Sequence, residues 1–298
     1  MPRVRVPLAI AAAGLVAAAT LVAATGGGSA EPVPSGSHAR GARPSAHQAA
    51  LHISGKIGSR PAGGRGERRA HDYVAGQFRA AGLEVTVSPF RVPGRGRSRN
   101  VIGALETPHQ CLIVLMAHTD SVPPGLGAVD NASGVGVLVG LAPGLAAPNP
   151  PCDVWLVATG AEERVVIGTS YHVGAAALVK TVRNGGREGD LRFALSVDEV
   201  GRGRRFYLRS PQPSTRPAVE GAILGAAGRA GVTVRWARDS GQGNSDHREF
   251  ELAGLPGAVI EVWKGIDPCH HEDCDRPGRI QKGALNRVQA VVEEVVKG

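Results

Sequence analysis

The sequence predicts an α/β fold: a single domain of three layers in which a central mixed, mostly parallel sheet is flanked by helices. Apolar runs of strand length alternate with helical patterns from about residue 47 to the C-terminus, an order typical of a sheet covered on both faces. Several of these runs end directly in Asp, Glu or His, as happens where an open sheet binds its ligands. The length suits one domain with a sizeable core.

The N-terminal residues carry an export signal. Arg3 and Arg5 precede a long run of Ala, Val and Leu that ends in small residues, a pattern that predicts a secretory signal peptide over 1–30. An uncleaved membrane anchor is the alternative because the run approaches spanning length, but its alanines and small-residue exit favour cleavage. Residues 31–46, rich in Pro, Gly, Ser and Arg, are expected to form a flexible linker before the globular domain, 47–298.

Local signals predict each element of that domain. Helices are expected where apolar residues recur at helical spacing, as Leu285, Val288 and Val292 do, and Gly82 and Pro143 end or interrupt two of them. Strands are expected where apolar and β-branched residues run together between turn residues. In chain order the predicted elements are helix 65–81, strands 83–89, 100–105 and 112–116, helical stretch 135–145, strands 154–158 and 191–197, helix 218–230, strand 232–237, a short helix from 246, strand 258–262 and helix 284–296.

Acidic and imidazole side chains follow three of these strands. His118 and Asp120 come after the third predicted strand, Glu162 and Glu163 after the fourth, and Asp198 after the fifth. Because the carboxyl ends of parallel strands meet at one edge of a sheet, we expect these groups to converge. Asp120 is also placed to accept a ring N–H from His118 and so fix the orientation of the imidazole.

Two further segments offer possible metal ligands. Asp130 opens the helical stretch 135–145, where it would be a helix cap or a bridging ligand, and His271 lies in a short loop between two cysteines. Two neighbouring divalent cations need a bridging carboxylate, with carboxylates and imidazoles in the remaining positions. The residue types therefore suit a binuclear zinc site. Of the adjacent glutamates we assign Glu163 to the metal and Glu162 to proton transfer.

A series of short motifs runs through most of the chain in a specific order. They are Ile-Gly-Ser-Arg-Pro at 57–61, Asn-Val-Ile at 100–102, His118-x-Asp120, Asp130-Asn-Ala-Ser-Gly, Gly160-Ala-Glu-Glu, Asp198, Ser-Asp246-His with Phe250, and Cys269-x-His271-x-x-Cys274. Each is weak alone, but the order resembles that of secreted bacterial zinc aminopeptidases, leucine aminopeptidase-like zinc exopeptidases related to glutaminyl cyclases and glutamate carboxypeptidases.

The resemblance implies a zinc exopeptidase fold with two zinc ions as cofactors. In it Asp130 bridges both ions, Glu163 and His271 complete one site, and His118 and Asp198 complete the other. Glu162 is then the general base, while Asp120 and Asp246 support the ligands without binding metal. The resemblance also implies a cis peptide bond after Asp130, a geometry that is rare without proline.

Two positions depart from the pattern of the family. Familiar secreted members have a tyrosine before the last histidine, where it helps to hold the oxyanion, and this chain has His270 there. An imidazole can donate the same hydrogen bond in a suitable protonation state, so we predict a catalytic role for His270. Some members carry an arginine just before the Ser-Asp-His motif, and this chain has Asn244. Both departures bear on substrate preference.

The four cysteines agree with export to an oxidising compartment. A disulfide between Cys269 and Cys274 would hold the loop that carries His271. Cys111 and Cys152 each begin a strand-like run, and they would form a second disulfide if those strands are neighbours. A cysteine zinc site is the alternative, but the cysteines lack a paired C-x-x-C arrangement.

Simpler interpretations exist for each residue taken alone. An Asp before an apolar stretch is usually a helix cap, and a pair of glutamates is usually solvated. The joint occurrence of ligand-type residues behind several strands favours a catalytic zinc site. The remaining histidines without such context are interpreted as surface or packing residues: His52, His71, His109 and His172.

The predicted function is hydrolysis of the N-terminal peptide bond of peptides or proteins by a secreted, extracellular monomer without stable membrane insertion after signal cleavage. The chain has 34 Lys and Arg against 26 Asp and Glu, a net charge of +8, and only 4% aromatic residues. Few aromatics leave little stacking surface for bases, so we interpret the charge as favouring solubility and affinity for the cell envelope rather than nucleic-acid binding. The alternatives are a glutaminyl cyclase-like or carboxypeptidase-like zinc enzyme, or a non-catalytic binding ectodomain on a peptidase scaffold.

Overall fold

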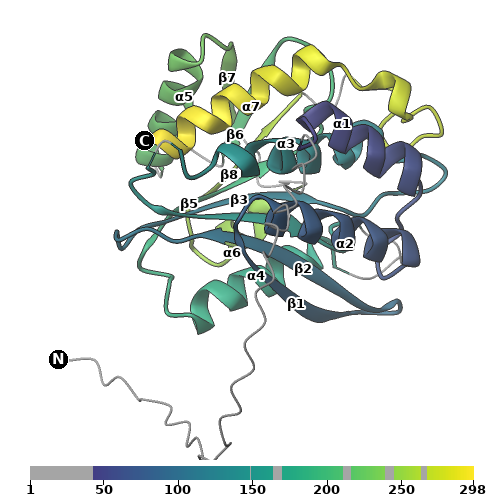
Figure 1. Ribbon diagram of the computed structural model, residues 1–298, viewed down its shortest axis with the longest axis horizontal. Coiled ribbons are helices and arrows are strands. Elements are labelled where there is room, and N and C mark those ends of the chain that lie inside the picture. The colour runs from purple at the N-terminus through teal and green to yellow at the C-terminus, as the bar shows by residue number, and fades with distance from the viewer. Residues whose placement is uncertain (1–42, 148, 164–169, 211–215, 239–244, 263–266) are drawn as a thin grey trace, which may run out of the picture. The chain divides into compact units, whose positions relative to one another are not determined.

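The computed structural model describes residues 43–147, 149–163, 170–210, 216–238, 245–262 and 267–298. In this part of the chain a mixed eight-stranded sheet carries helices on both faces (Figure 1), which confirms the predicted α/β fold. The predicted signal peptide and most of the linker lie outside the described residues. The linker prediction ends one residue too late, because Ser45 caps a helix that begins at Ala46. Within the described residues, no helix combines the length and apolar character that crossing a membrane requires.

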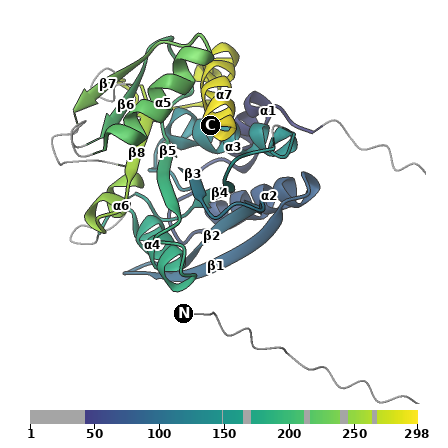
Figure 2. The ribbon, with the colours of Figure 1, turned by 90° about the vertical axis from the view of Figure 1, so that its left-hand side faces the viewer.

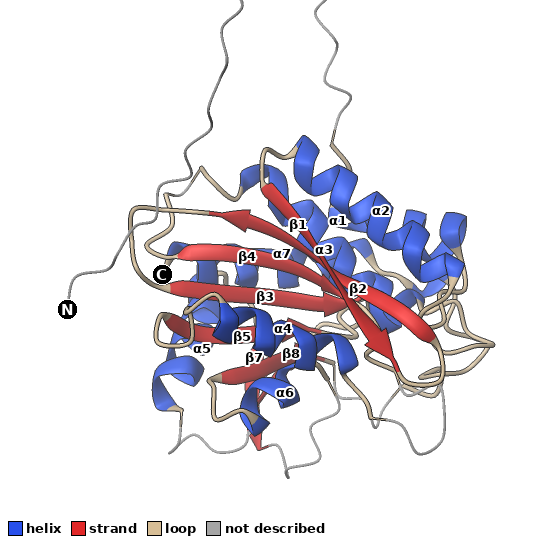
Figure 3. Ribbon diagram, turned by 90° about the horizontal axis from the view of Figure 1, so that it is seen from below, coloured by secondary structure: helices blue, strands red, loops and turns tan. Residues whose placement is uncertain are grey.

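The central strands of the sheet run in the same direction and end at one edge. β3 pairs in parallel with β4 and β5, and β5 pairs in parallel with β8, whereas β1 and β2 form an antiparallel hairpin beside β4 (Figure 3). The sheet order is β1-β2-β4-β3-β5-β8-β6-β7. The strands span Glu84–Val92, Gly96–Leu105, Leu112–His118, Asp153–Thr159, Leu191–Val197, Phe206–Ser210, Val234–Arg238 and Gly257–Glu261, numbered β1 to β8.

Helices cover both faces of the sheet because its central strands are apolar on both sides. In β3, Leu112, Val114 and Met116 pack with α4 and α6, while Ile113 and Leu115 pack on the opposite side with the other helices. Figure 2 shows α4 and α6 on one side of the sheet and α3 and α7 on the other. This alternation is expected of a strand buried on both faces. The helices are α1 Ala46–Leu51, α2 Arg65–Ala80, α3 Ser133–Leu141, α4 Val173–Asn184, α5 Pro217–Arg229, α6 His247–Leu252 and α7 Lys282–Lys297.

Three elements are absent from the sequence prediction, namely α1, α4 and β6. α1 has only six residues before the chain passes into a π-helix, His52–Ile57, and β6 has only five, so neither shows a clear period. α4 begins after His172, which has a left-handed φ of 55° and makes no side-chain cap, so the usual start signal is missing. The hairpin is also longer than predicted, since β1 reaches Val92 and β2 starts at Gly96.

Candidate metal centre

His118, the last residue of β3, anchors a first cluster of polar side chains. Its Nε2 lies 3.1 Å from Oδ1 of Asp130 and 3.4 Å from Oδ1 of Asp198, the residue that follows β5. All three side chains are buried. Their ligand atoms lie within 4.8 Å of one another, close enough to surround a single ion.

His271 anchors a second cluster beside the first. Its Nε2 lies 2.9 Å from Oε1 of Glu163 and 3.2 Å from Oδ2 of Asp130. Asp130 therefore directs one carboxylate oxygen to each cluster. The structure thus brings together all five residues that the sequence nominates as zinc ligands, although they are separated by as many as 153 positions in the chain.

The electrostatics of the clusters suit bound cations. Burial alone would lower the pKa of His118, but nearby carboxylates, Glu162 and Asp198 foremost, raise it well above its usual value. At His271 burial is likewise outweighed, by hydrogen bonds to Asp130 and Glu163, and the pKa rises to about 9. The carboxylates around His118 and His271 therefore stabilise positive charge between them. Imidazole nitrogens and carboxylate oxygens are donors that zinc accepts, so the residues fit that metal.

The backbone around the clusters has unusual conformations. The peptide bond between Asp130 and Asn131 is cis, as the family resemblance implies. Ala161, Glu199 and His271 have positive φ values of 51°, 49° and 60°. Such angles are uncommon for residues other than glycine and are found disproportionately at functional sites.

Asp120 and Asp246 brace the segments that carry the clusters. Asp120 accepts hydrogen bonds of 3.0 Å from the backbone amides of both Glu162 and Glu163, while its Oδ1 stays 3.7 Å from Nδ1 of His118. The closest partners of Asp120 are thus these two backbone amides, rather than the ring of His118 that the sequence suggested. Asp246, just before α6, accepts a hydrogen bond from the hydroxyl of Thr159 at the end of β4.

Arg60 ties two cluster-bearing segments together from a fully buried position. Its guanidinium donates to the carbonyl of Thr119, between His118 and Asp120, at 2.7 Å, and to the carbonyls of Leu126 and Gly127 at 2.7 and 2.8 Å. The latter pair begins the turn that leads to Asp130. Arg60 belongs to the Ile-Gly-Ser-Arg-Pro motif, for which the sequence suggested no specific task.

We expect Arg60→Met to lower the free energy of unfolding by at least about 3 kcal/mol, because it leaves several buried carbonyls without their charged donor. Urea unfolding of the metal-free protein measures this. Arg65→Met, which changes a nearby exposed arginine, should shift the free energy by no more than about 0.5 kcal/mol. Equal effects of the two substitutions would contradict a bracing role for Arg60.

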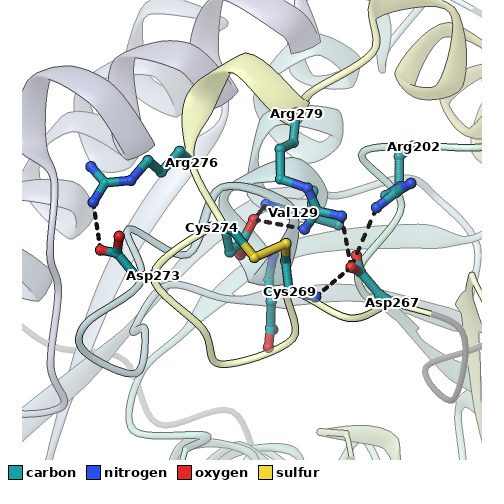
Figure 4. The surroundings of a disulfide bond; sticks show 10 residues. Val129, Arg202, Asp267, Cys269, Asp273, Cys274, Arg276 and Arg279 are labelled. Atoms are coloured by element: carbon teal, nitrogen blue, oxygen red, sulfur yellow. Dashed lines mark hydrogen bonds and ion pairs between the residues drawn. A yellow bond between two sulfur atoms is a disulfide. The ribbon is translucent and has the colours of Figure 1, made fainter.

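The loop of His271 is closed by a disulfide between Cys269 and Cys274 (Figure 4). Directly after it, the buried carboxylate of Asp275 accepts hydrogen bonds from the backbone amides of Val129, at 2.9 Å, and Asp130, at 3.1 Å. One short loop thus supplies both the imidazole of His271 and the group that holds the Asp130 backbone. The second predicted disulfide, Cys111 to Cys152, is also present and joins the starts of the neighbouring strands β3 and β4.

Asp267 holds the other end of this loop. It accepts hydrogen bonds from the backbone amide of Cys269 at 2.9 Å and from the guanidinium of Arg279 at 2.7 Å, and it forms an ion pair with Arg202 (Figure 4). The loop is therefore fastened at both ends as well as by its disulfide.

His270 stacks on His271, with ring centroids 3.8 Å apart. Its Nδ1 lies 3.2 Å from Oδ2 of Asp130 and contacts a carboxylate oxygen of Glu199, a residue that the sequence analysis did not nominate. These two carboxylates raise the pKa of His270 to about 10. His270 could also join Asp130 and His271 around an ion.

His172 lies at the site, and its interpretation as a surface or packing residue was incomplete. It is buried, its Nε2 is 3.4 Å from Oε1 of Glu162, and its Nδ1 is 3.6 Å from Oε1 of Glu249 in α6. Its backbone amide also donates to the carbonyl of Glu162 at 2.7 Å. No motif around His172 marks this role, because the contact depends on how α4 begins.

These residues line a cavity of about 220 Å³ formed by Asp130, Glu162, Glu163, Tyr171, His172, His270 and His271. Tyr171 is an exposed residue of this lining. The other three histidines that the sequence suggests to be surface or packing residues do not line this cavity: His52 stacks on Tyr73, His71 is buried against the carbonyl of Thr159, and His109 is exposed. Asn244 lies outside the described residues.

Residues 100–296 match the family model described as Peptidase family M28. Among characterised proteins the chain is similar to leupeptin-inactivating enzyme 1 of Streptomyces exfoliatus, with 27% identity over 77% of this chain and 55% of that protein. It is also similar to the probable lipoprotein aminopeptidase LpqL of Mycobacterium tuberculosis, with 28% identity over 63% of this chain and 43% of the relative. The chain thus spans about half the length of these relatives.

Solved structures share the fold. A zinc aminopeptidase from Bacillus subtilis superposes with a TM-score of 0.75 at 17% identity, covering 84% of this chain and 93% of that one. A glutaminyl cyclase from Porphyromonas gingivalis superposes almost equally well, with a TM-score of 0.73 at 22% identity over 85% and 96% of the two chains.

Proposed function

Because this chain belongs to peptidase family M28, we propose that it is a zinc-dependent aminopeptidase that removes the N-terminal residue of peptides and proteins. The observation that carries this proposal is the position of Asp130, whose two oxygens face the cluster of His118 and the cluster of His271. A carboxylate shared in this way is what two adjacent zinc ions need. Asp198 would complete one ion's ligands and Glu163 the other's.

When bound, the zinc ions would polarise the substrate carbonyl and lower the pKa of the attacking water. Glu162 takes the proton of that water and passes it to the leaving amine. His172 and Glu249 keep the Glu162 side chain turned toward the cavity. The Nδ1 of His270 faces Asp130 and Glu199, so Nε2 is the nitrogen that donates to the developing oxyanion. The free amine of the substrate pairs with the carboxylates that line the cavity.

The enzyme acts outside the cytoplasm as a monomer. The predicted signal peptide, the two disulfides and the similarity to a lipoprotein aminopeptidase support export to the extracellular side or the cell envelope. The second candidate is a glutaminyl cyclase, because a cyclase shares the fold almost as closely as an aminopeptidase does.

A panel of blocked and unblocked peptides tests the function. We expect zinc-loaded protein to release the first residue of leucyl peptides with a free amine, to leave the acetylated peptides intact, and to accept peptides amidated at the C-terminus. A strong chelator should abolish turnover and added zinc should restore it. Pyroglutamate formation from a peptide that begins with Gln, without hydrolysis of leucyl peptides, would instead establish a cyclase. Cleavage that requires a free carboxylate would indicate a carboxypeptidase.

A further inference from the structure

The tip of the β1–β2 hairpin and the start of α2 form a concentrated basic surface. We name it the basic hairpin surface and define it by five exposed arginines: Arg65, Arg68, Arg91, Arg95 and Arg97. Arg68 and Arg97 line one pocket, and the turn that contains Arg95 packs so closely on Gly63 that an added Cβ there would lie 2.7 Å from the Arg95 carbonyl oxygen. The hairpin and the helix start therefore form one continuous patch.

The arginines of this surface are not balanced by acidic partners. Within the described part of the chain none of the five forms an ion pair, whereas their neighbour Arg99 pairs with Asp72 at 2.5 Å. Arg91 and Arg97 are directly opposite one another in the antiparallel register. Like charges in such a cross-strand pair are destabilising, so folding stability does not account for them.

Hydrogen bonds and apolar contacts connect the basic hairpin surface with the segment that carries Glu162. The buried carboxylate of Glu67 accepts hydrogen bonds from Gly63 and Ser98, at the base of the surface, and from the amide of Ala161, which precedes Glu162. Val92 of the hairpin belongs to the same apolar cluster as Ala161. In Figure 3 the hairpin turn lies at the end of the sheet toward which β3 points, the end that carries the site.

The base of this surface is close to the cavity, because Glu67 contacts Ala161 and the next residue, Glu162, lines the cavity. An extended chain advances by roughly 3.3 Å per residue, so a peptide that leaves the cavity toward the hairpin needs only a few residues beyond the cleaved bond to meet the arginines. Charges there act over about 10 Å at moderate ionic strength. Carboxylates are the peptide groups that arginine binds best, because its planar fork matches them.

We propose that the basic hairpin surface binds acidic side chains located a few residues beyond the scissile bond, so that the substrates are peptides with acidic residues near their N-terminus. This inference rests on the proposed aminopeptidase function and adds the substrate class to it. Part of the net positive charge of the chain would then serve to bind substrate near the candidate metal centre.

The test compares three pentapeptides that begin with Leu-Ala-Ala and end with two Asp, two Ser or two Lys. At low ionic strength kcat/KM for the Asp peptide should exceed that for the Ser peptide by about tenfold, with the Lys peptide lowest, and high salt should remove the difference. Arg91→Ser/Arg97→Ser removes two of the five arginines and should lower the preference for the Asp peptide severalfold while leaving turnover of the Ser peptide unchanged. The control Arg79→Ser/Arg192→Ser removes the same charge from exposed positions away from the hairpin turn. This variant should keep the preference for the Asp peptide.

The outcomes separate this inference from the proposed function. No hydrolysis of the Ser peptide by the wild-type protein would overturn the aminopeptidase proposal, and anisotropy of labelled Asp and Ser peptides would still measure whether the surface selects acidic chains. Equal kcat/KM for the Asp and Ser peptides, or a preference that Arg91→Ser/Arg97→Ser leaves undiminished, would overturn the acidic-substrate inference. Binding to phosphatidylglycerol vesicles without peptide selectivity would also overturn it, in favour of an anionic membrane as the partner.

Discussion

Glu162→Gln is expected to lower kcat by about a thousandfold or more while the zinc content of the protein stays that of the wild type. The substitution keeps the size of the side chain and an oxygen near His172, but an amide cannot take a proton from water, and proton transfer of this kind contributes about 10² to 10⁴ in rate. Because Glu162 is not among the five proposed ligands, the two zinc sites should remain complete. Steady-state kinetics and elemental analysis on the same sample measure both quantities.

Glu272→Gln provides the matched control, because it makes the same chemical change at an exposed residue of the His271 loop. Its kcat should stay within about twofold of the wild-type value, since surface changes away from the chemistry have small effects. A Glu162→Gln protein with near-native turnover would exclude Glu162 as the base. A protein that loses zinc together with activity would mean that Glu162 binds metal, as its proximity to His118 and Glu163 permits.

The sheet could be predicted because its central strands are buried on both faces. Runs such as Leu112 to Met116 are apolar throughout, and only a covered, largely parallel strand needs that composition. The hairpin of β1 and β2 was less predictable at its tip, where arginines replace the apolar alternation that marks a strand. There the strands continue through the pairing of Arg91 with Arg97, although the charged residues around them do not predict a strand.

Three of the ligand-type residues could be nominated because they follow strands that the sequence reveals, and the other two because they lie in the Asp130-Asn-Ala-Ser-Gly and Cys269-x-His271-x-x-Cys274 motifs. Asp120 and Asp246 could be nominated as supporting groups in the same way, but others could not, since they act through contacts that only the folded chain creates. Arg60 meets the carbonyls of Leu126 and Gly127 across more than 60 residues, and Asp275 meets the amide of Asp130 across 145. His172 contacts Glu162 from a left-handed backbone position directly before α4, which no sequence motif marks.

Asp130→Ala is expected to eliminate binding of both zinc ions, whereas Asp198→Ala should weaken only the ion held with His118. The geometry makes this distinction, because each oxygen of Asp130 faces a different imidazole, His118 or His271, while Asp198 contacts His118 alone among them. Removal of a group that merely supports a ligand costs about 10- to 100-fold in metal affinity, so loss of a ligand shared by two ions should cost more at both sites.

Elemental analysis after dialysis against a graded series of chelator concentrations tests the distinction. The wild type should retain two zinc ions per chain, Asp198→Ala one, and Asp130→Ala none, with far-ultraviolet circular dichroism confirming that each variant is folded. Asp273→Ala, at an exposed acid in the loop of His271, should retain both ions. If Asp130→Ala keeps one ion, the two clusters bind metal independently and Asp130 is not a bridge. If it keeps both, neither ion depends on the carboxylate that the geometry places between them, and the binuclear proposal is wrong.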